Sequence, residues 1–129
     1  MPPSPSKPKN KARIEAYRGG HRGEALAAWY LRFKLYRIIA RRYKTPLGEI
    51  DLIVQRFGTI AFVEVKARSK AETEAMTLEG INQSRISRAA QYWLARHPGK
   101  AETPFRFDVI FLAPGRWPRH VINAFDASS

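Results

Sequence analysis

Charged side chains alternate with apolar residues in two neighbouring strand-like runs, and they are the first candidates for chemistry. Glu64 and Lys66 lie two positions apart in one run, and Glu49 and Asp51 do so in the other. Charges inside such segments cost free energy unless they are paired or coordinate something. Carboxylate oxygens suit Mg²⁺ or Mn²⁺, which take their remaining ligands from water and phosphate. A nearby lysine can then orient or deprotonate the attacking water.

The two runs are expected to form an antiparallel hairpin. Leu47–Gln55 and Thr59–Arg68 are rich in Val, Ile and Phe and are separated by a short segment that ends in Phe57-Gly58. If these two residues form the loop, positions whose numbers sum to 115 lie opposite each other. Phe57 is a poor residue for a positive φ, but a four-residue loop would keep the same parity.

This register places the four charged side chains on one face of the sheet. Asp51 then faces Glu64, and Glu49 faces Lys66, because side chains alternate between faces along a strand. One interpretation is a divalent-cation site. The other is a pair of cross-strand ion pairs on a solvated face, which antiparallel sheets commonly have.

Four segments in order resemble a known family: GEALAAWYL at residues 23–31, GEIDLI at 48–53, FVEVKAR at 62–68 and RFDVI at 106–110. They are similar to the YraN-type family of bacterial proteins. That family resembles archaeal Holliday-junction resolvases and the wider P-D-(D/E)-x-K nuclease group. The resemblance runs from about Arg18 to Phe125 and implies an endonuclease-like fold.

The resemblance assigns roles to the charged residues. It implies that Asp51 and Glu64 are metal ligands for Mg²⁺ or Mn²⁺ and that Lys66 is the catalytic lysine. Glu24 corresponds to an additional acidic residue on the first helix of resolvase-like members. From the residues alone, Glu24 is equally well explained as a carboxylate near the positive end of a helix.

One segment departs from the family pattern. The later helix usually starts with a Lys-Gln sequence, whereas residues 82–85 read Asn-Gln-Ser-Arg here. The loss of a lysine weakens any phosphate contact that it would supply, although it leaves the carboxylates unaffected. Resolvase-like relatives act as dimers, so a homodimer is a further expectation.

Composition predicts one domain with a polyanionic partner. The chain of 129 residues is 44% hydrophobic, which suits a single core, and we expect one endonuclease-like domain over residues 14–129. A net charge of +12 favours nucleic acid, DNA more than RNA. No apolar run reaches transmembrane length, the N-terminus has no hydrophobic segment of the signal-peptide type, and the chain has no cysteine. These features favour a cytoplasmic protein without a membrane partner.

Residues 1–13 are expected to be a disordered basic arm. They alternate prolines with lysines and contain almost nothing apolar, so burial cannot offset the entropy of ordering them. Such an arm can track phosphates or simply keep the terminus soluble.

The remaining pattern predicts an α/β protein with a restriction-endonuclease-like core, a mixed β-sheet flanked by helices in the order α-β-β-β-α-β-β. In addition to the hairpin, we expect two helices, from Ile14 or His21 to Phe33 and from Gln83 to Arg96, and three strands, Tyr36–Tyr43, Phe105–Leu112 and His120–Phe125. Asn82 is expected to cap the second helix.

Several basic residues are candidate contacts for nucleic acid: Arg41, Arg42, Lys44, Arg68, Arg85 and Arg88. They are equally consistent with solvated turns and an ordinary wet helix face. Asp108 is expected to be a structural ion-pair partner of a nearby arginine, and the three histidines are expected to be surface or satisfied residues.

Together these observations predict a metal-dependent endonuclease-like protein that acts on DNA, with branched or otherwise structured DNA as a candidate substrate. The alternative is a non-catalytic nucleic-acid-binding protein that retains a nuclease fold. A third hypothesis is an interaction protein whose basic surface binds another protein.

Overall fold

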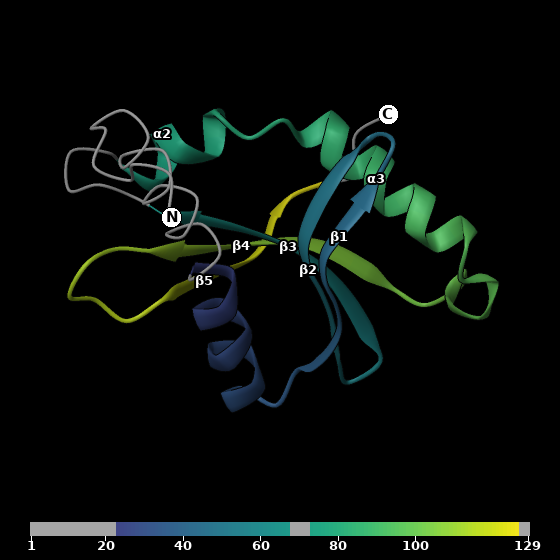
Figure 1. Ribbon diagram of the computed structural model, residues 1–129, viewed down its shortest axis with the longest axis horizontal. Coiled ribbons are helices and arrows are strands. Elements are labelled where there is room, and N and C mark those ends of the chain that lie inside the picture. The colour runs from purple at the N-terminus through teal and green to yellow at the C-terminus, as the bar shows by residue number, and fades with distance from the viewer. Residues whose placement is uncertain (1–22, 68–72, 127–129) are drawn as a thin grey trace, which may run out of the picture.

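A computed structural model describes residues 23–67 and 73–126 of the protein, which fold around one mixed sheet (Figure 1). The five strands lie in chain order. They are β1 (Arg37–Thr45), β2 (Gly48–Arg56), β3 (Thr59–Ala67), β4 (Phe105–Leu112) and β5 (Arg119–Phe125). β3 and β4 are parallel, and the other neighbours are antiparallel. The predicted α/β class and mixed sheet are confirmed.

Helices precede the sheet and connect its parallel strands. Residues 23–33 are helical, and α2 (Glu74–Glu79), α3 (Gln83–Ala95) and the 3₁₀ turn η1 (Pro98–Lys100) lie between β3 and β4. The predicted order is confirmed, with the short α2 as an addition. Asn82 caps α3 as expected, since its side chain accepts a hydrogen bond from the Arg85 amide. The predicted basic arm and Arg68 lie outside the described residues.

Each face of the sheet is covered by one helix. The helix of residues 23–33 packs against one side through Ala27 and Leu31, and α3 packs against the other through Ala89 and Trp93 (Figure 1). Successive residues of β3, and of β2 from Leu52 to Val54, point into the two cores in turn. Both strands are therefore apolar on both faces, which explains their continuous hydrophobic runs. Within the part of the chain that is described, no helix is long and apolar enough to cross a membrane.

The hairpin between β2 and β3 has the predicted register. Paired positions run from Leu52 with Val63 to Arg56 with Thr59, so the loop is the two residues Phe57 and Gly58. Phe57 has φ 51° and Gly58 has φ 77°, and positive φ at both positions matches the twist of a two-residue hairpin. Phe57 adopts this conformation although its Cβ disfavours it.

Candidate metal centre

β2 and β3 separate at one end of the hairpin, and the candidate site lies where they part. Their last pair at this end is Leu52 with Val63. Beyond that point β2 continues alongside β1, and β3 continues alongside β4. Asp51 follows on β2, and its Oδ2 accepts a hydrogen bond from the Val65 amide at 2.8 Å. The Asp51 carboxylate thereby takes the place of a ladder bond and is fixed at the point of divergence.

The carboxylates of Asp51 and Glu64 lie side by side. Glu64 interacts with Asp51, and the Lys66 ammonium lies 3.6 Å from Glu64 Oε2. The Glu64 side chain is 17% exposed. Burial and the adjacent Asp51 raise the pKa of Glu64 to about 8, although Lys66 lowers it. At neutral pH Glu64 is therefore mainly protonated, and a cation that replaced this proton would relieve the repulsion between the two carboxylates.

The carboxylates open into a hollow of about 430 Å³ between the sheet and the start of α3. Its lining includes all four charged residues of the predicted cluster and the first residues of the crossover helix: Glu49, Asp51, Glu64, Val65, Lys66, Gly80, Asn82, Arg85 and Ile86. The hairpin register therefore has the predicted outcome, with the four charged side chains on one side of the sheet.

The ion pairs within this cluster differ from the expected pairs across β2 and β3. Glu49 Oε1 lies 3.5 Å from Arg42 Nε on β1, whereas Lys66 pairs with Glu64 along its own strand. Because the ladder between β2 and β3 ends before these positions, the side chains turn to nearer partners. The alternative of two cross-strand pairs between β2 and β3 is thus not the arrangement observed.

Arg85 reaches the hollow across Gly48. A Cβ added to Gly48 would lie 2.7 Å from Arg85 Cγ and 2.8 Å from Cδ, and Gly48 has φ +147°. Only glycine meets both conditions without strain. The stem of Arg85 is therefore packed over the start of β2, and a cation is present at the start of α3 even though the lysine of the family pattern is absent.

The structure does not bring Glu24 to the other carboxylates. Its Oε2 lies 2.5 Å from Arg41 Nε, Oε1 accepts from Arg41 Nη2 at 3.3 Å, and its side chain is 6% exposed. This pair lines a second hollow together with Arg42 and Lys44. Arg41, Arg42 and Lys44, three of the predicted nucleic-acid contacts, thus lie close together. Arg88 is exposed on α3 and does not line either hollow.

Within residues 23–67 and 73–126, no three His, Cys, Asp or Glu side chains lie close enough to hold a metal ion. A divalent cation at this site would therefore take two carboxylates from the described part of the protein. Mg²⁺ accepts such a site, because it commonly keeps several waters and binds through one or two carboxylates together with substrate phosphate. The oxygen donors of Asp51 and Glu64 fit Mg²⁺ or Mn²⁺ in this respect.

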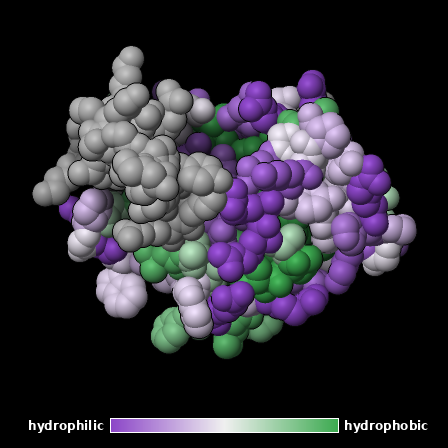
Figure 2. Space-filling model, viewed as in Figure 1, coloured by the Kyte–Doolittle hydropathy of each residue, from purple (hydrophilic) through white to green (hydrophobic). Residues whose placement is uncertain are grey.

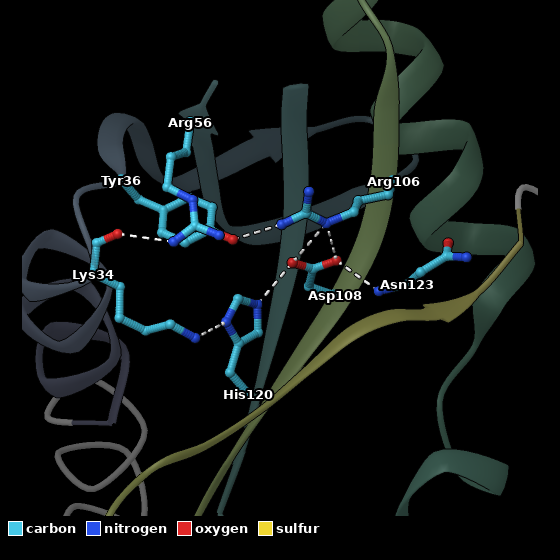
Figure 3. Close-up of polar contacts among 7 residues, drawn as sticks. All are labelled: Lys34, Tyr36, Arg56, Arg106, Asp108, His120 and Asn123. Atoms are coloured by element: carbon cyan, nitrogen blue, oxygen red, sulfur yellow. Dashed lines mark hydrogen bonds and ion pairs between the residues drawn. The ribbon is translucent and has the colours of Figure 1, made fainter. Parts of the chain in front are cut away.

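The carboxylate of Asp108, on β4, has a different environment (Figure 3). Asp108 is 0% exposed and lies close to three donors: Arg106 Nε at 2.9 Å, His120 Nε2 at 2.7 Å and the Asn123 amide at 2.9 Å. Burial raises the pKa of Asp108, but these hydrogen bonds outweigh it and the pKa is lowered. The predicted structural ion pair with an arginine is confirmed.

The Asp108 cluster also ties the end of the first helix to the far strands. Lys34 Nζ lies 2.8 Å from His120 Nδ1, and Arg106 Nη2 donates to the Tyr36 hydroxyl at 2.6 Å. Sequence reasoning did not find the contact between Lys34 and His120, which are 86 positions apart. The expectation that His120 is a satisfied histidine is confirmed.

Comparison with known proteins places the chain in a family. The family model described as "Uncharacterised protein family UPF0102" matches residues 23–112, which includes both carboxylates, Lys66 and Arg85. The chain belongs to the UPF0102 family.

Its UPF0102 relatives match over nearly their whole length. A UPF0102 protein of Rhodopseudomonas palustris (strain BisA53) is 48% identical over 126 residues, covering 98% of this chain and 97% of the relative. One of Bradyrhizobium diazoefficiens is 51% identical over 117 residues, covering 91% and 88%. One of Chelativorans sp. (strain BNC1) is 50% identical over 116 residues, covering 90% and 94%. The predicted family is therefore confirmed.

Proposed function

We propose that this UPF0102 protein is a metal-dependent endonuclease that acts on DNA, with Mg²⁺ or Mn²⁺ held by Asp51 and Glu64. The observation that carries the proposal is that Asp51, Glu64 and Lys66 line one hollow. There, burial and the adjacent Asp51 raise the pKa of Glu64 to about 8, although a lysine lies 3.6 Å away. Perturbed carboxylates in a hollow are typical of functional sites. The net charge of +12 supports a polyanionic substrate.

The residues around the carboxylates have complementary roles. A divalent ion, when bound, polarises a phosphoryl oxygen and lowers the pKa of a coordinated water. Lys66, 3.6 Å from Glu64, holds the attacking water and offsets charge on the phosphate. Arg85, which lines the same hollow, binds a phosphate oxygen of the DNA backbone.

A cleavage assay tests the proposal. Wild type is incubated with single-stranded, duplex and four-way branched DNA, with Mg²⁺, Mn²⁺ or a chelator. We expect cleavage only with metal. Asp51→Asn and Glu64→Gln should reduce the rate by at least about a hundredfold, because each removes a charged ligand but keeps the side-chain shape. Exposed Asp126→Asn and Glu102→Gln are matched controls and should cleave like wild type.

Lys66→Met separates catalysis from metal binding. Since Lys66 supplies no ligand, this variant should lose cleavage and still bind the cation. If wild type cuts none of these substrates faster than Glu64→Gln does, the nuclease proposal is wrong for them. DNA binding that persisted in that case would favour the non-catalytic binding protein.

A further inference from the structure

The first helix carries an exposed aromatic surface that the proposed site does not use. Trp29, Phe33 and Trp117 are 68%, 86% and 87% exposed. The aromatic surface is defined by a hollow of about 300 Å³ whose lining is almost wholly apolar: Leu26, Trp29, Tyr30, Phe33, Trp117 and Pro118. Hydrophobic atoms reach the surface along the lower edge of Figure 2, where the helix of residues 23–33 lies. Contiguous exposed apolar groups of this kind mark interaction sites.

Cations are interleaved with the rings. The Arg32 guanidinium lies 5.4 Å from the centre of the Trp29 ring, and the Lys34 ammonium lies 5.2 Å from the centre of the Tyr30 ring. The whole chain carries a net charge of +12. A ligand that matches this surface must offer flat apolar faces and negative charge at short intervals. Unpaired nucleotides do so, since each base has a face for stacking and each linkage has a phosphate.

The aromatic surface is distinct from the carboxylate hollow. Phe62 of β3 packs in the core that includes α3, and Glu64, two residues further along the strand, shares that face of the sheet. The helix that bears Trp29 and Phe33 covers the opposite face, where Val63 packs against it. A nucleotide stacked on these rings therefore cannot be the one whose phosphate enters the carboxylate hollow.

We propose that the aromatic surface is a stacking site for the bases of a single-stranded nucleic-acid segment. The proposal rests on the proposed function for the class of partner and deepens it. The preferred substrate is then DNA that has unpaired nucleotides as well as the strand to be cut. A fully paired duplex keeps its bases stacked inside the helix and gains nothing from this surface.

Binding measurements without cleavage test this inference. Anisotropy of a labelled oligo-dT and of a labelled blunt duplex is measured in a chelator with the full chain. Trp29→Ala and Trp117→Ala should each weaken oligo-dT binding by about tenfold, because a stacked base contributes on that scale. Duplex binding should change by less than about twofold. Trp117→Phe should retain most of the affinity, since it keeps an aromatic face.

Met76→Ala on α2 is the matched control, because Met76 is another large exposed apolar residue, 57% exposed, and does not line this hollow. It should bind oligo-dT like wild type. Thermal unfolding should show all variants folded, since each replaced side chain is largely outside the core.

Three results would overturn the inference. The first is that the tryptophan variants bind oligo-dT as tightly as wild type. The second is a wild-type dimer in sedimentation that becomes monomeric in these variants with oligo-dT affinity unchanged, which would make the surface an interface between two copies. The third is that wild type binds phosphatidylserine vesicles and the variants lose this binding while their oligo-dT affinity is unchanged.

The measurement separates this inference from the nuclease proposal. Selective loss of oligo-dT binding in the tryptophan variants supports the stacking site even if wild type cleaves nothing. Cleavage by wild type together with unchanged oligo-dT binding in the variants overturns the stacking site alone. A wild type that binds no oligo-dT at all also overturns it.

Discussion

Glu64 and Asp108 are both largely shielded from solvent in the same sheet, and their surroundings are opposite. Asp108 lies close to nitrogen donors of Arg106, His120 and Asn123, and its pKa is lowered. Glu64 meets Asp51, and its pKa is raised to about 8. Burial acts in the same direction on both, so the difference comes from the partners.

The difference separates a charge that is compensated within the fold from one that is not. The charge of Asp108 is compensated within the protein, which makes its hydrogen bonds part of the fold. At Glu64, burial and the adjacent Asp51 outweigh the ammonium of Lys66, so its charged form is disfavoured. Stability is reduced at such a site, and a bound cation can restore it.

The largest effect is expected from removing the compensated charge. Asp108→Ala leaves Arg106 and His120 buried without their acceptor, and should reduce the free energy of unfolding by about 3–5 kcal/mol. Urea denaturation at neutral pH measures this. Exposed Asp126→Ala is the control and should change stability by less than about 0.5 kcal/mol. Equal losses of stability in Asp108→Ala and Asp126→Ala would contradict a structural role for Asp108.

Neutralising Glu64 should instead raise the free energy of unfolding. Its raised pKa means that the folded state holds a proton that the unfolded chain releases, so wild-type stability falls as the pH rises from about 4.5 to about 8. Glu64→Gln should avoid this loss and be about 4 kcal/mol more stable than wild type at pH 8 without metal. At pH 4 the two proteins should unfold at similar urea concentrations. A Glu64→Gln variant less stable than wild type at pH 8 contradicts the comparison.

The lowered pKa of Asp108 gives the complementary pH dependence. Its stabilising contribution is complete above the unfolded pKa, near 3.8, and is lost as the pH falls through the lower folded value. Asp108→Asn should therefore lack this component of acid unfolding while Asp126→Asn retains it. Urea titrations between pH 2 and pH 5 measure the slope, and equal slopes in all three proteins would contradict this assignment.

A divalent cation should stabilise only one of the two sites. At ten times its dissociation constant, Mg²⁺ or Mn²⁺ should stabilise wild type by about 1.4 kcal/mol. The gain should disappear in Asp51→Asn and Glu64→Gln and persist in Glu102→Gln. Thermal unfolding with and without the cation measures it. Stabilisation that survived in Glu64→Gln would place the cation elsewhere.

The smallest effect concerns Arg85. If it contacts one phosphate, Arg85→Ala should reduce the slope of log affinity against log salt by about one. Arg88→Ala, on the same helix but outside the hollow, is the comparison. A lower slope in Arg85→Ala only would support a phosphate contact at the carboxylate hollow. Equal changes in both variants would indicate that phosphates contact α3 along its length.

The sequence was most informative where local rules apply. A two-residue loop at Phe57-Gly58 between two apolar runs was sufficient to predict the register that places Asp51 and Glu64 on one face, because the period of a strand is fixed. The six-residue helix α2 was too short for a periodic pattern.

Contacts distant in sequence were not predictable in the same way. The salt bridge of Glu24 to Arg41, the Lys34–His120 contact and the passage of Arg85 over Gly48 each depend on how separate elements pack together. No local periodicity encodes such packing.

The one parallel pairing in the sheet also affects how the chain is made. β3 pairs with β4, which starts only after the crossover of residues 68–104. At about 5–20 residues per second, translation leaves that edge of β3 without its partner for about 2–7 s. An apolar edge of this kind promotes aggregation, and charges within a strand oppose it. We therefore expect Glu64 and Lys66 to limit aggregation of the nascent chain during synthesis, an effect that does not depend on catalysis.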